Sequence, residues 1–335
     1  MAEESIHMPR AAAEELVRTA LQNSSTSAEN AASVARALVA AEVDGQAGHG
    51  FSRVASYAAQ ARSGKVDGNA KPEIVQQTAS FAGIDAVNGF AFPAIDLAIE
   101  TLTEITPKTG LAGVGIRRSH HCGQLGAHVE RLADQGLVAL MVTNAPKAIA
   151  PWGGHAPLFG TNPIAFAAPR KDEAPLVIDL SLSKVARGKI MAASKAGKQI
   201  PEGWALSPDG QPTTDPKEAL AGTMIPAGDA KGAALALIVE ILAATLIGAN
   251  HSYEATSFFD AEGGPPGVGQ TLIAFAPDVL SGGGFSDRLE GLLNALLAQE
   301  GTRLPGTRRL DGRSRAERDG VAVPAHLHAE ISAMT

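Results

Sequence analysis

The chain has 335 residues, about the length of two average domains, and 45% of them are hydrophobic, which excludes an intrinsically disordered protein. Its net charge of −7 excludes the basic surface that a nucleic-acid-binding protein needs. The single cysteine, Cys122, excludes an internal disulfide framework.

The first 64 residues are predicted to be helical. Pro9 suits the first turn of a helix. Thr26 and Glu29 have the spacing of a capping box that begins a second helix. Gly64 is placed to end a third helix as its C-cap. We therefore expect helices at residues 9–21, 26–43 and 48–64.

From residue 74 onward, short β-branched or glycine-rich segments alternate with longer segments of helical periodicity. Strands are expected within residues 74–88 and at residues 111–116, 137–143, 163–168, 176–180 and 270–276. Helices are expected at residues 92–106, 123–136, 184–196, 231–248 and 286–299. The basic tail is expected to be irregular. This alternation predicts a mixed α/β or α+β fold.

The sequence gives no sign of a membrane span or a targeting segment. The N-terminal residues Met-Ala-Glu-Glu are acidic and lack the apolar region of a signal peptide. The longest apolar stretch, residues 232–249, is rich in alanine and is interrupted by Glu240, which favours a buried helix over a membrane span. We therefore expect a cytoplasmic protein without a membrane partner.

Common signatures of nucleotide-binding and catalytic sites are absent. The chain has no P-loop, no nucleophile elbow of the G-x-S-x-G type and no H-E-x-x-H zinc motif. Gly113-Val114-Gly115 continues with Ile116 and two arginines, which breaks the Rossmann pattern G-x-G-x-x-G. A dinucleotide would therefore have to bind by another route.

Residues 48–53 read Gly-His-Gly-Phe-Ser-Arg and place His49 and Arg53 on one face of the predicted helix. Tyr57 and Gln60 extend the same stripe. A histidine that donates a proton, beside an arginine that binds a carboxylate in a bidentate manner, is the pair needed to reduce a 2-oxo acid. The alternative is a solvated polar helix face.

Residues 119–126 read Ser-His-His-Cys-Gly-Gln-Leu-Gly and join a predicted strand to a predicted helix. Such a turn suits an exposed histidine and backbone N–H groups that bind an anion. One alternative is a zinc site of His120 or His121 with Cys122 and His128, although a second ligand pair with metal spacing is missing. The other is a pair of histidines that are hydrogen-bonded at a helix N-terminus without further function.

Residues 151–163 combine Trp152 with several glycines and prolines, which predicts a tightly shaped loop. An ordinary buried turn is the alternative. Taken without further comparison, these three segments indicate an α/β protein that is an enzyme.

At these residues the sequence resembles the type-2 malate/L-lactate dehydrogenase family. This family includes malate, L-lactate, sulfolactate and ureidoglycolate dehydrogenases, and reductases of piperideine-2-carboxylate and pyrroline-2-carboxylate. Seven blocks in the same order, spread over nearly the whole chain, are more specific than any one motif. The blocks are GHGFSR (48–53), SHHCG (119–123), APWGGHAPLFGTNPIAFAAP (150–169), VIDLSLSKVARGKI (177–190), IPEGWALSPDGQPTTDP (200–216), KGAALALIVEIL (231–242) and RLPGTRR (303–309).

The resemblance implies a fold without a Rossmann domain. The cofactor-binding domain, expected at residues 116–290, would have a mixed, largely antiparallel sheet with helices. A helical, substrate-binding region is expected at residues 1–115, completed by residues 291–335. Members of this family are typically homodimers with active sites near the subunit interface, so a homodimer is expected here.

The resemblance also implies roles for individual residues. His49 matches a proton donor, Arg53 the arginine that binds the substrate carboxylate, and Thr161 a position that contacts the substrate. His121 matches an acid/base histidine and also begins a cofactor-lining stretch. The expected cofactor-binding residues are His121, Cys122, Gly123, Gln124, Leu125, Asp179, Leu180, Ser181, Arg303, Leu304, Pro305, Gly306, Thr307, Arg308 and Arg309.

The implied reaction is an NAD(P)-dependent hydride transfer between nicotinamide and a small 2-hydroxy or 2-oxo acid, without a metal. The arginines at residues 303–309 favour NADPH over NADH, because a 2′-phosphate pairs with them. Two departures bear on the alternative, a cyclic imino acid reductase. Gly48 replaces the serine of many members, and Lys189 replaces an aspartate of the imine reductases. A non-catalytic, cofactor-binding relative is a remote third possibility.

Overall fold

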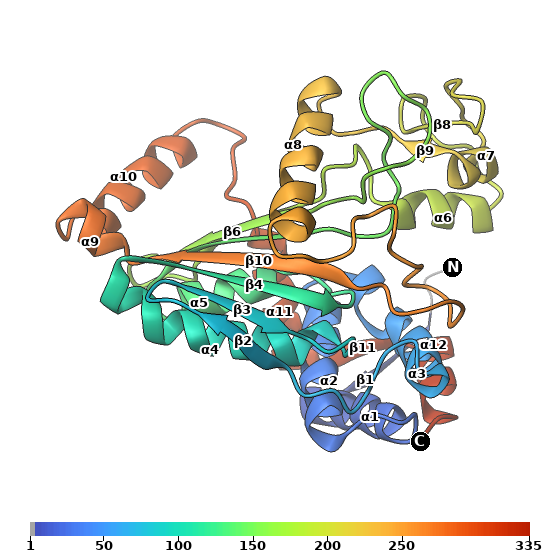
Figure 1. The fold of residues 1–335 in the computed structure, drawn as a ribbon, viewed down its shortest axis with the longest axis horizontal. Coiled ribbons are helices and arrows are strands. Elements are labelled where there is room, and N and C mark those ends of the chain that lie inside the picture. Colours follow the sequence, from blue (N-terminus) through green and yellow to red (C-terminus); the bar gives the residue numbers. More distant parts are fainter. Residues whose placement is uncertain (1–3) are drawn as a thin grey trace.

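The computed structural model describes residues 4–335, which fold around a seven-stranded sheet (Figure 1). Its strands are β2 (Glu73–Gln77), β3 (Phe81–Asp85), β4 (Leu111–Ser119), β5 (Val138–Thr143), β6 (Ile164–Ala168), β7 (Leu176–Leu180) and β10 (Val268–Phe275). They are ordered β2-β3-β4-β10-β5-β6-β7. β3 and β4 are parallel and every other neighbouring pair in this sheet is antiparallel. The predicted mixed, largely antiparallel and non-Rossmann sheet is therefore confirmed.

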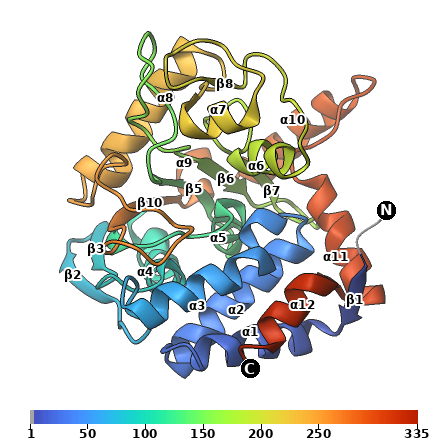
Figure 2. The ribbon, with the colours of Figure 1, turned by 90° about the vertical axis from the view of Figure 1, so that its right-hand side faces the viewer.

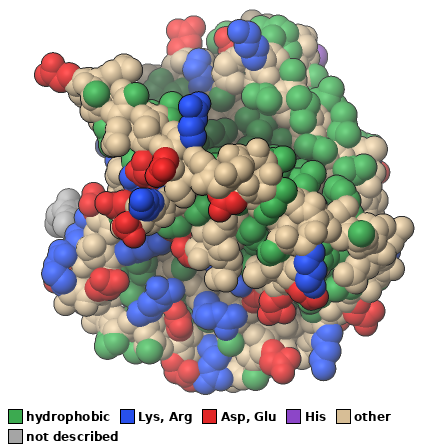
Figure 3. Space-filling view, turned by 90° about the vertical axis from the view of Figure 1, so that its left-hand side faces the viewer, with side chains coloured by type: hydrophobic (Ala, Val, Ile, Leu, Met, Phe, Trp, Pro, Cys, Tyr) green, Lys and Arg blue, Asp and Glu red, His purple; other side chains and the backbone are tan. Residues whose placement is uncertain are grey.

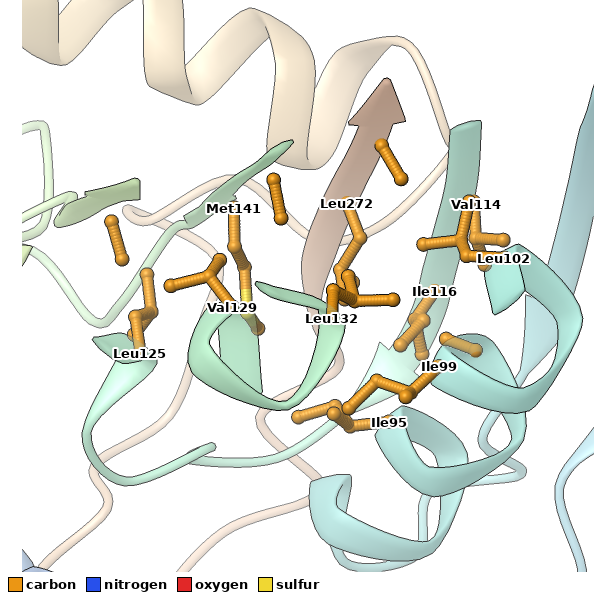
Figure 4. Close-up of a cluster of buried hydrophobic side chains, with 14 of the residues drawn as sticks. Ile95, Ile99, Leu102, Val114, Ile116, Leu125, Val129, Leu132, Met141 and Leu272 are labelled. Carbon is orange, nitrogen blue, oxygen red and sulfur yellow. The ribbon is translucent and has the colours of Figure 1, made fainter. Parts of the chain in front are cut away.

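Two helices, α4 (Ala91–Thr109) and α5 (Leu125–Ala133), cover one face of this sheet. Their apolar sides meet the inward side chains of the central strands in one buried core (Figure 4). Along β4 the buried residues Ala112, Val114 and Ile116 recur at every second position, as expected for a strand with one face on the core. This core holds the end of β4 in place, and the paired histidines His120 and His121 follow directly.

The N-terminal helices pack with the C-terminal end of the chain (Figure 2). β1 (Ser5–Met8) pairs antiparallel with β11 (Val321–Pro324). The prediction of an irregular tail is therefore wrong, because the partner strand of β11 lies at the other end of the chain and leaves no local signal. The helices of this part are α1 (Arg10–Gln22), α2 (Ala28–Val43), α3 (Val54–Ser63), α11 (Thr307–Asp319) and α12 (Ala325–Ser332).

A third group of elements stands over the opposite face of the sheet (Figure 1). It includes α8 (Ala230–Glu240), which continues into a π-helical turn at Ile241–Thr245. Beyond the end of β10, two helices project from the body as an arm: α9 (Pro277–Ser281) and α10 (Phe285–Leu297). The elements that stand over the sheet together with α8 are α6 (Arg187–Lys195), β8 (Ala205–Leu206), α7 (Pro216–Ala221) and β9 (Thr223–Met224).

The helix predicted from residue 48 begins later than expected. His49 lies in a 3-10 turn (Ala47–His49), Arg53 ends a second one (Phe51–Arg53), and α3 begins only at Val54. Gly50 separates the two turns, and a Cβ at this position would overlap the present position of the Glu42 carboxylate, which accepts the backbone N–H of Phe51. The helix-face argument for His49 and Arg53 is thus wrong, although the turns still keep the two residues together.

The capping box is displaced by one residue. Ser27, not Thr26, caps α2, because the Ser27 hydroxyl accepts the backbone N–H of Asn30 at 3.3 Å. The Thr26 hydroxyl is buried without a hydrogen-bond partner in the described part of the chain. Two other predicted helix ends, one after residue 43 and one at Gly64, are confirmed.

The sheet takes β2, β3 and most of β4 from the N-terminal side of residue 115. The predicted domain division at that residue therefore does not follow the sheet, and it stays a prediction. Within residues 4–335, no helix combines the length and hydropathy needed to cross a membrane.

Candidate active site

The fold brings His49 and His121 into direct contact. Nδ1 of His49 lies 3.2 Å from Nε2 of His121. The ring planes differ by 12°, and the ring centroids are 5.1 Å apart. The two imidazole rings are thus nearly parallel and are joined by a hydrogen bond between these nitrogens. One histidine comes from the turn before α3 and the other from the end of β4, so the two predicted histidine segments share one site.

Both of these histidines are neutral near pH 7. Burial, together with the positive charge of Arg53, lowers the pKa of His49 to about 4. Burial and the same arginine hold the pKa of His121 well below its usual value. A neutral imidazole has one nitrogen that donates and one that accepts. The donor or acceptor role of one nitrogen therefore fixes the opposite role of the other.

Tyr57 lies behind the histidine pair. Its hydroxyl oxygen is 2.5 Å from Nδ1 of His121, and its side chain is completely buried. Its ring packs against Phe90, with centroids 5.4 Å apart. The sequence placed Tyr57 on the stripe of His49 and Arg53 but predicted no role for it. The signal was its position one helical turn after Arg53.

Arg53 lies beside the histidines with an unoccupied guanidinium edge. Its Nε donates to the carbonyl oxygen of Gly48 at 2.7 Å, and its Cζ lies 4.5 Å above the ring of Phe259. No carboxylate between residues 4 and 335 pairs with it. The remaining N–H groups can therefore bind an external carboxylate in a bidentate manner.

The residues of the zinc alternative have other partners. Nε2 of His120 lies 2.8 Å from Oε1 of Gln60, and Nε2 of His128 lies 2.8 Å from the carbonyl oxygen of Cys122. Burial lowers the pKa of His120 to about 3 and that of His128 to about 4. Throughout the described chain, no group of three His, Cys, Asp or Glu side chains is placed to hold a metal ion. These two histidines therefore support the core around the site.

Three segments predicted to bind the cofactor converge near the start of α5. Asp179, at the end of β7, accepts the backbone N–H of Gly126 at 2.7 Å. A Cβ at Gly306 would lie 3.1 Å from the carbonyl oxygen of Val177, so the C-terminal segment also touches β7. We call this surface the cofactor strip, and it begins at the histidine pair. It consists of residues 121–125, 179–181 and 303–309.

Several residues of the cofactor strip are already engaged. Asp179 caps α5, so a carboxylate of the chain itself occupies N–H groups that the sequence offered to an anion. Arg309 pairs with Glu130 at 2.7 Å. Arg303 and Arg308 are exposed and make no ion pair within residues 4–335. These two arginines are therefore the cations of the strip that are available to a phosphate.

The other residues of the cofactor strip differ in how far their side chains are exposed. The side chains of Cys122, Leu125 and Leu304 are buried, and burial raises the pKa of the Cys122 thiol to about 12. Gln124 is also buried, and its amide donates to Asp44 at 3.0 Å. By contrast, the side chain of Leu180 is 46% exposed. The histidine end of the strip thus offers mainly backbone, and the β7 end offers side chains.

Thr161 lies in a loop that is held by a buried carboxylate. The carbonyl oxygen of Thr161 accepts the backbone N–H of Leu182 at 2.8 Å, and in the described chain its hydroxyl makes no hydrogen bond. The next residue, Asn162, has φ 39° and donates to Oε2 of Glu240 at 2.8 Å. Glu240 also accepts from the backbone and the hydroxyl of Ser252, both at 2.6 Å. The sequence indicated Glu240 only as an interruption in an apolar helix.

Replacing Glu240 by alanine should lower the free energy of unfolding by about 3 kcal/mol, because buried donors of Asn162 and Ser252 then lose their acceptor. Urea unfolding measures this change. The matched control is Glu104→Ala, a glutamate whose side chain is 75% exposed on α4, for which a change within about 0.5 kcal/mol is expected. Equal losses in the two variants would contradict a role for Glu240 as the centre of this network.

Comparisons with known proteins agree with this arrangement. A family model described as malate/L-lactate dehydrogenase matches residues 8–332. The chain is 57% identical, over 82% of the length of each protein, to a (2R)-3-sulfolactate dehydrogenase (NADP(+)) of Chromohalobacter salexigens. It is 38% identical to a delta(1)-pyrroline-2-carboxylate reductase of Ancylobacter novellus, over 99% of this chain and 98% of the relative.

A solved structure is similar over the whole fold. The crystal structure of delta1-piperideine-2-carboxylate reductase from Pseudomonas syringae superposes with a TM-score of 0.94 and 37% identity. The match covers 98% of this chain and all of that one. The family resemblance predicted from the seven sequence blocks is confirmed: the chain belongs to the malate/L-lactate dehydrogenase family of oxidoreductases.

Proposed function

We propose that the chain interconverts a small 2-oxo acid and the matching 2-hydroxy acid, with NADPH as the preferred reductant. The observation that carries this proposal is the unpaired guanidinium of Arg53 beside the neutral pair of His49 and His121. A 2-oxo acid has a carboxylate and a carbonyl on adjacent carbons, so an arginine and a proton donor must lie side by side.

The residues would divide the work as follows. Arg53 binds the carboxylate and fixes the neighbouring carbon, and His49 faces the oxygen on that carbon and supplies its proton. A bound reduced nicotinamide supplies the hydride. Thr161 contacts the substrate from the loop that Glu240 holds. The two histidines are neutral, so the net positive charge of the pocket comes from Arg53 and favours an anionic substrate.

The cofactor strip fits a dinucleotide, because it runs from the histidine pair to two guanidinium groups without ion-pair partners in the described residues. We assign Arg303 and Arg308 to cofactor phosphates, including a 2′-phosphate, and assign the backbone of residues 121–125 to the nicotinamide end. The use of NADP(+) by the sulfolactate dehydrogenase relative supports this preference. We also propose a cytoplasmic location, because the reduced cofactor is available there.

Reduction of a cyclic imino acid is the second candidate. Two relatives named as reductases of such acids match 98–99% of the chain. Two residues argue against it. Gly48 has open space around a would-be Cβ, so a serine is missing although it would fit. Lys189 is exposed on α6, where the imine reductases have aspartate. The Ser-His-Asp relay expected of an imine reductase is therefore absent from these positions.

A substrate panel tests the proposal. Oxidation of NADPH and of NADH would be followed by absorbance with pyruvate, oxaloacetate, sulfopyruvate, pyrroline-2-carboxylate and piperideine-2-carboxylate. We expect one of the oxo acids, with NADPH, to give the highest kcat/KM. A clear preference for either cyclic imine would overturn the primary proposal in favour of the second candidate.

We further propose that the enzyme is a homodimer that covers the outer face of α8. Five aliphatic side chains on and just after this helix are between 43% and 67% exposed. The arm formed by α9 and α10 adds Val279, Leu280 and Leu292, which are at least 65% exposed. Figure 3 shows hydrophobic side chains around a hollow on the side that carries this arm. The residues of the α8 face are Leu235, Leu237, Ile238, Ile241 and Leu246.

The Ile238→Lys variant should weaken the dimer about a hundredfold, because a charge at the centre of an apolar interface loses its hydration. Light scattering on a sizing column measures the mass across a dilution series. Val75→Lys is the matched control, since this residue is equally exposed but lies on the edge strand β2. A wild-type chain that remains a monomer at all concentrations would refute the dimer.

A further inference from the structure

Tyr57, His121 and His49 form a line of hydrogen-bonding groups. The Tyr57 hydroxyl contacts Nδ1 of His121 at 2.5 Å, and Nε2 of His121 contacts Nδ1 of His49 at 3.2 Å. Nε2 of His49 has no partner within residues 4–335, and the side chain is only partly buried. The line therefore has a closed end at Tyr57 and an open end at His49, where a ligand can bind.

The closed end fixes the direction of every hydrogen bond in the line. The Tyr57 hydroxyl has one proton and two acceptors in reach: Nδ1 of His121 at 2.5 Å and the carbonyl oxygen of His121 at 3.5 Å. The second distance is too long for an effective O–H···O bond. Tyr57 is completely buried, so a hydroxyl proton aimed at that carbonyl would lose most of its hydrogen-bond energy. Tyr57 therefore donates to Nδ1 of His121.

The tautomers of both histidines follow from this donor. His121 accepts at Nδ1, and because it is neutral its single proton is on Nε2. That nitrogen donates to Nδ1 of His49, so the single proton of His49 is on Nε2, at the open end. The resting enzyme thus presents an N–H, rather than a lone pair, to the substrate.

We propose that Tyr57 is a positioning residue that locks both tautomers and ends a proton relay through two neutral imidazoles, so that His49 protonates the substrate oxygen without first becoming charged. This inference rests on the proposed reduction of a 2-oxo acid. As the hydride reaches the carbonyl carbon, the carbonyl electron pair moves to the oxygen, which takes the Nε2 proton of His49. His49 takes a proton at Nδ1 from His121, and His121 takes the hydroxyl proton of Tyr57, which remains a tyrosinate until the relay is restored.

The relay is restored by one solvent proton. After the product leaves, this proton enters at Nε2 of His49, the open end, and the shifts run in reverse until the Tyr57 hydroxyl is reformed. Each turnover therefore consumes one hydride from the reduced nicotinamide and one proton from solvent, as reduction of a ketone to an alcohol requires. No second oxidant or reductant takes part.

The charged and titratable groups around the line favour a relay through neutral imidazoles over one through an imidazolium. Arg53 faces both histidines, and its positive charge opposes protonation of His49 and His121. The same charge stabilises transient negative charge on the Tyr57 oxygen, although burial raises the pKa of Tyr57. The other groups that face the line are neutral: His120 and the thiol of Cys122. Lys65, beyond His120, is paired with Asp260.

Kinetics of Tyr57→Phe test the relay, because phenylalanine keeps the ring and removes only the hydroxyl. We expect kcat for the best oxo acid to fall about thirtyfold, while KM stays within about twofold because Arg53 is unchanged. The wild-type rate should be flat between about pH 6 and 8, whereas the variant should gain activity toward acid pH, since it must use the imidazolium form of His49. A flat profile in Tyr57→Phe, or an unchanged kcat, would overturn the relay.

Tyr253→Phe is the matched control, because it makes the same change at the only other tyrosine. Its side chain is 51% exposed and stacks on His251. We expect its kcat and pH profile to equal those of the wild type. A loss shared by both variants would count against a specific role for the Tyr57 hydroxyl.

Nitrogen NMR of the histidine rings tests the tautomers without any substrate. In the wild type, His49 and His121, assigned by His49→Gln and His121→Gln, should each have the proton on Nε2, and in Tyr57→Phe the two rings should become tautomer mixtures. A proton on Nδ1 of His121 in the wild type would overturn the proposal whatever the activity. If the predicted tautomers are found but no oxo acid is turned over, the tautomer lock stands and the proposed function fails.

Discussion

Replacing Arg53 by methionine should lower kcat/KM for a 2-oxo acid about a thousandfold. A bidentate arginine–carboxylate contact consists of two charge-assisted hydrogen bonds, each worth about 2 kcal/mol, and about 1.4 kcal/mol corresponds to a factor of ten. Methionine keeps much of the length and the apolar stem that packs near Phe259, so the loss reports the guanidinium. Steady-state kinetics with the best substrate of the panel measure the effect.

The control separates carboxylate binding from general damage. Arg36→Met removes an arginine on α2 that is largely exposed and pairs with Asp96, and kcat/KM should remain unchanged. The wild type should also discriminate strongly between the oxo acid and its methyl ester, whereas Arg53→Met should treat the two nearly alike. If Arg53→Met still discriminates as the wild type does, the carboxylate binds elsewhere and the assignment of Arg53 is wrong.

The elements that the sequence predicted well are those whose signal is local. The helices over α1, α4 and α10 and the buried strands β5 to β7 are found close to the expected residues, because periodicity and turn residues lie within each segment. The pairing of β1 with β11 could not be predicted in this way. This pairing depends on contact between the two ends of the chain, and the local sequence of neither strand identifies its partner.

The candidate site shows the same limit. The segments of His49 and His121 were each singled out, but their spacing gave no reason to expect a hydrogen bond between the two rings. Tyr57 was noticed only as part of the stripe of His49 and Arg53. The role of a buried hydroxyl depends on the atom it contacts, and the sequence does not show that atom. The expected helix is replaced by two 3-10 turns on either side of Gly50, where the Glu42 carboxylate accepts the backbone N–H of Phe51.

Charge patterns in the sequence were also ambiguous. The arginines of residues 303–309 looked equivalent, yet Arg309 pairs with Glu130, which also pairs with Arg313, so it is a structural residue in the fold. Arg303 and Arg308 differ from it only in what surrounds them. Composition counts charges but not their partners, so the tertiary contacts are needed to tell the ion-paired arginines from those without an ion pair in the described residues.

His49→Gln should lower kcat for a 2-oxo acid about a thousandfold, and His121→Gln should lower it roughly tenfold to a hundredfold. The order follows from the geometry: both ring nitrogens of His121 are engaged, by Tyr57 and by His49, whereas Nε2 of His49 has no partner within residues 4–335. KM should change little in either variant, because Arg53 binds the carboxylate. Steady-state kinetics measure the order, with His7→Gln as control, an exposed histidine on β1.

The pH dependence gives an independent check on the same residue. Burial and Arg53 lower the pKa of His49 to about 4, so His49 is neutral well above that value and kcat/KM should show no break near pH 6.5, where an unperturbed histidine titrates. A larger loss in His121→Gln than in His49→Gln would instead make His121 the direct proton donor. A small loss in both would favour an iminium substrate, since an iminium already carries the proton that the reduced nitrogen keeps.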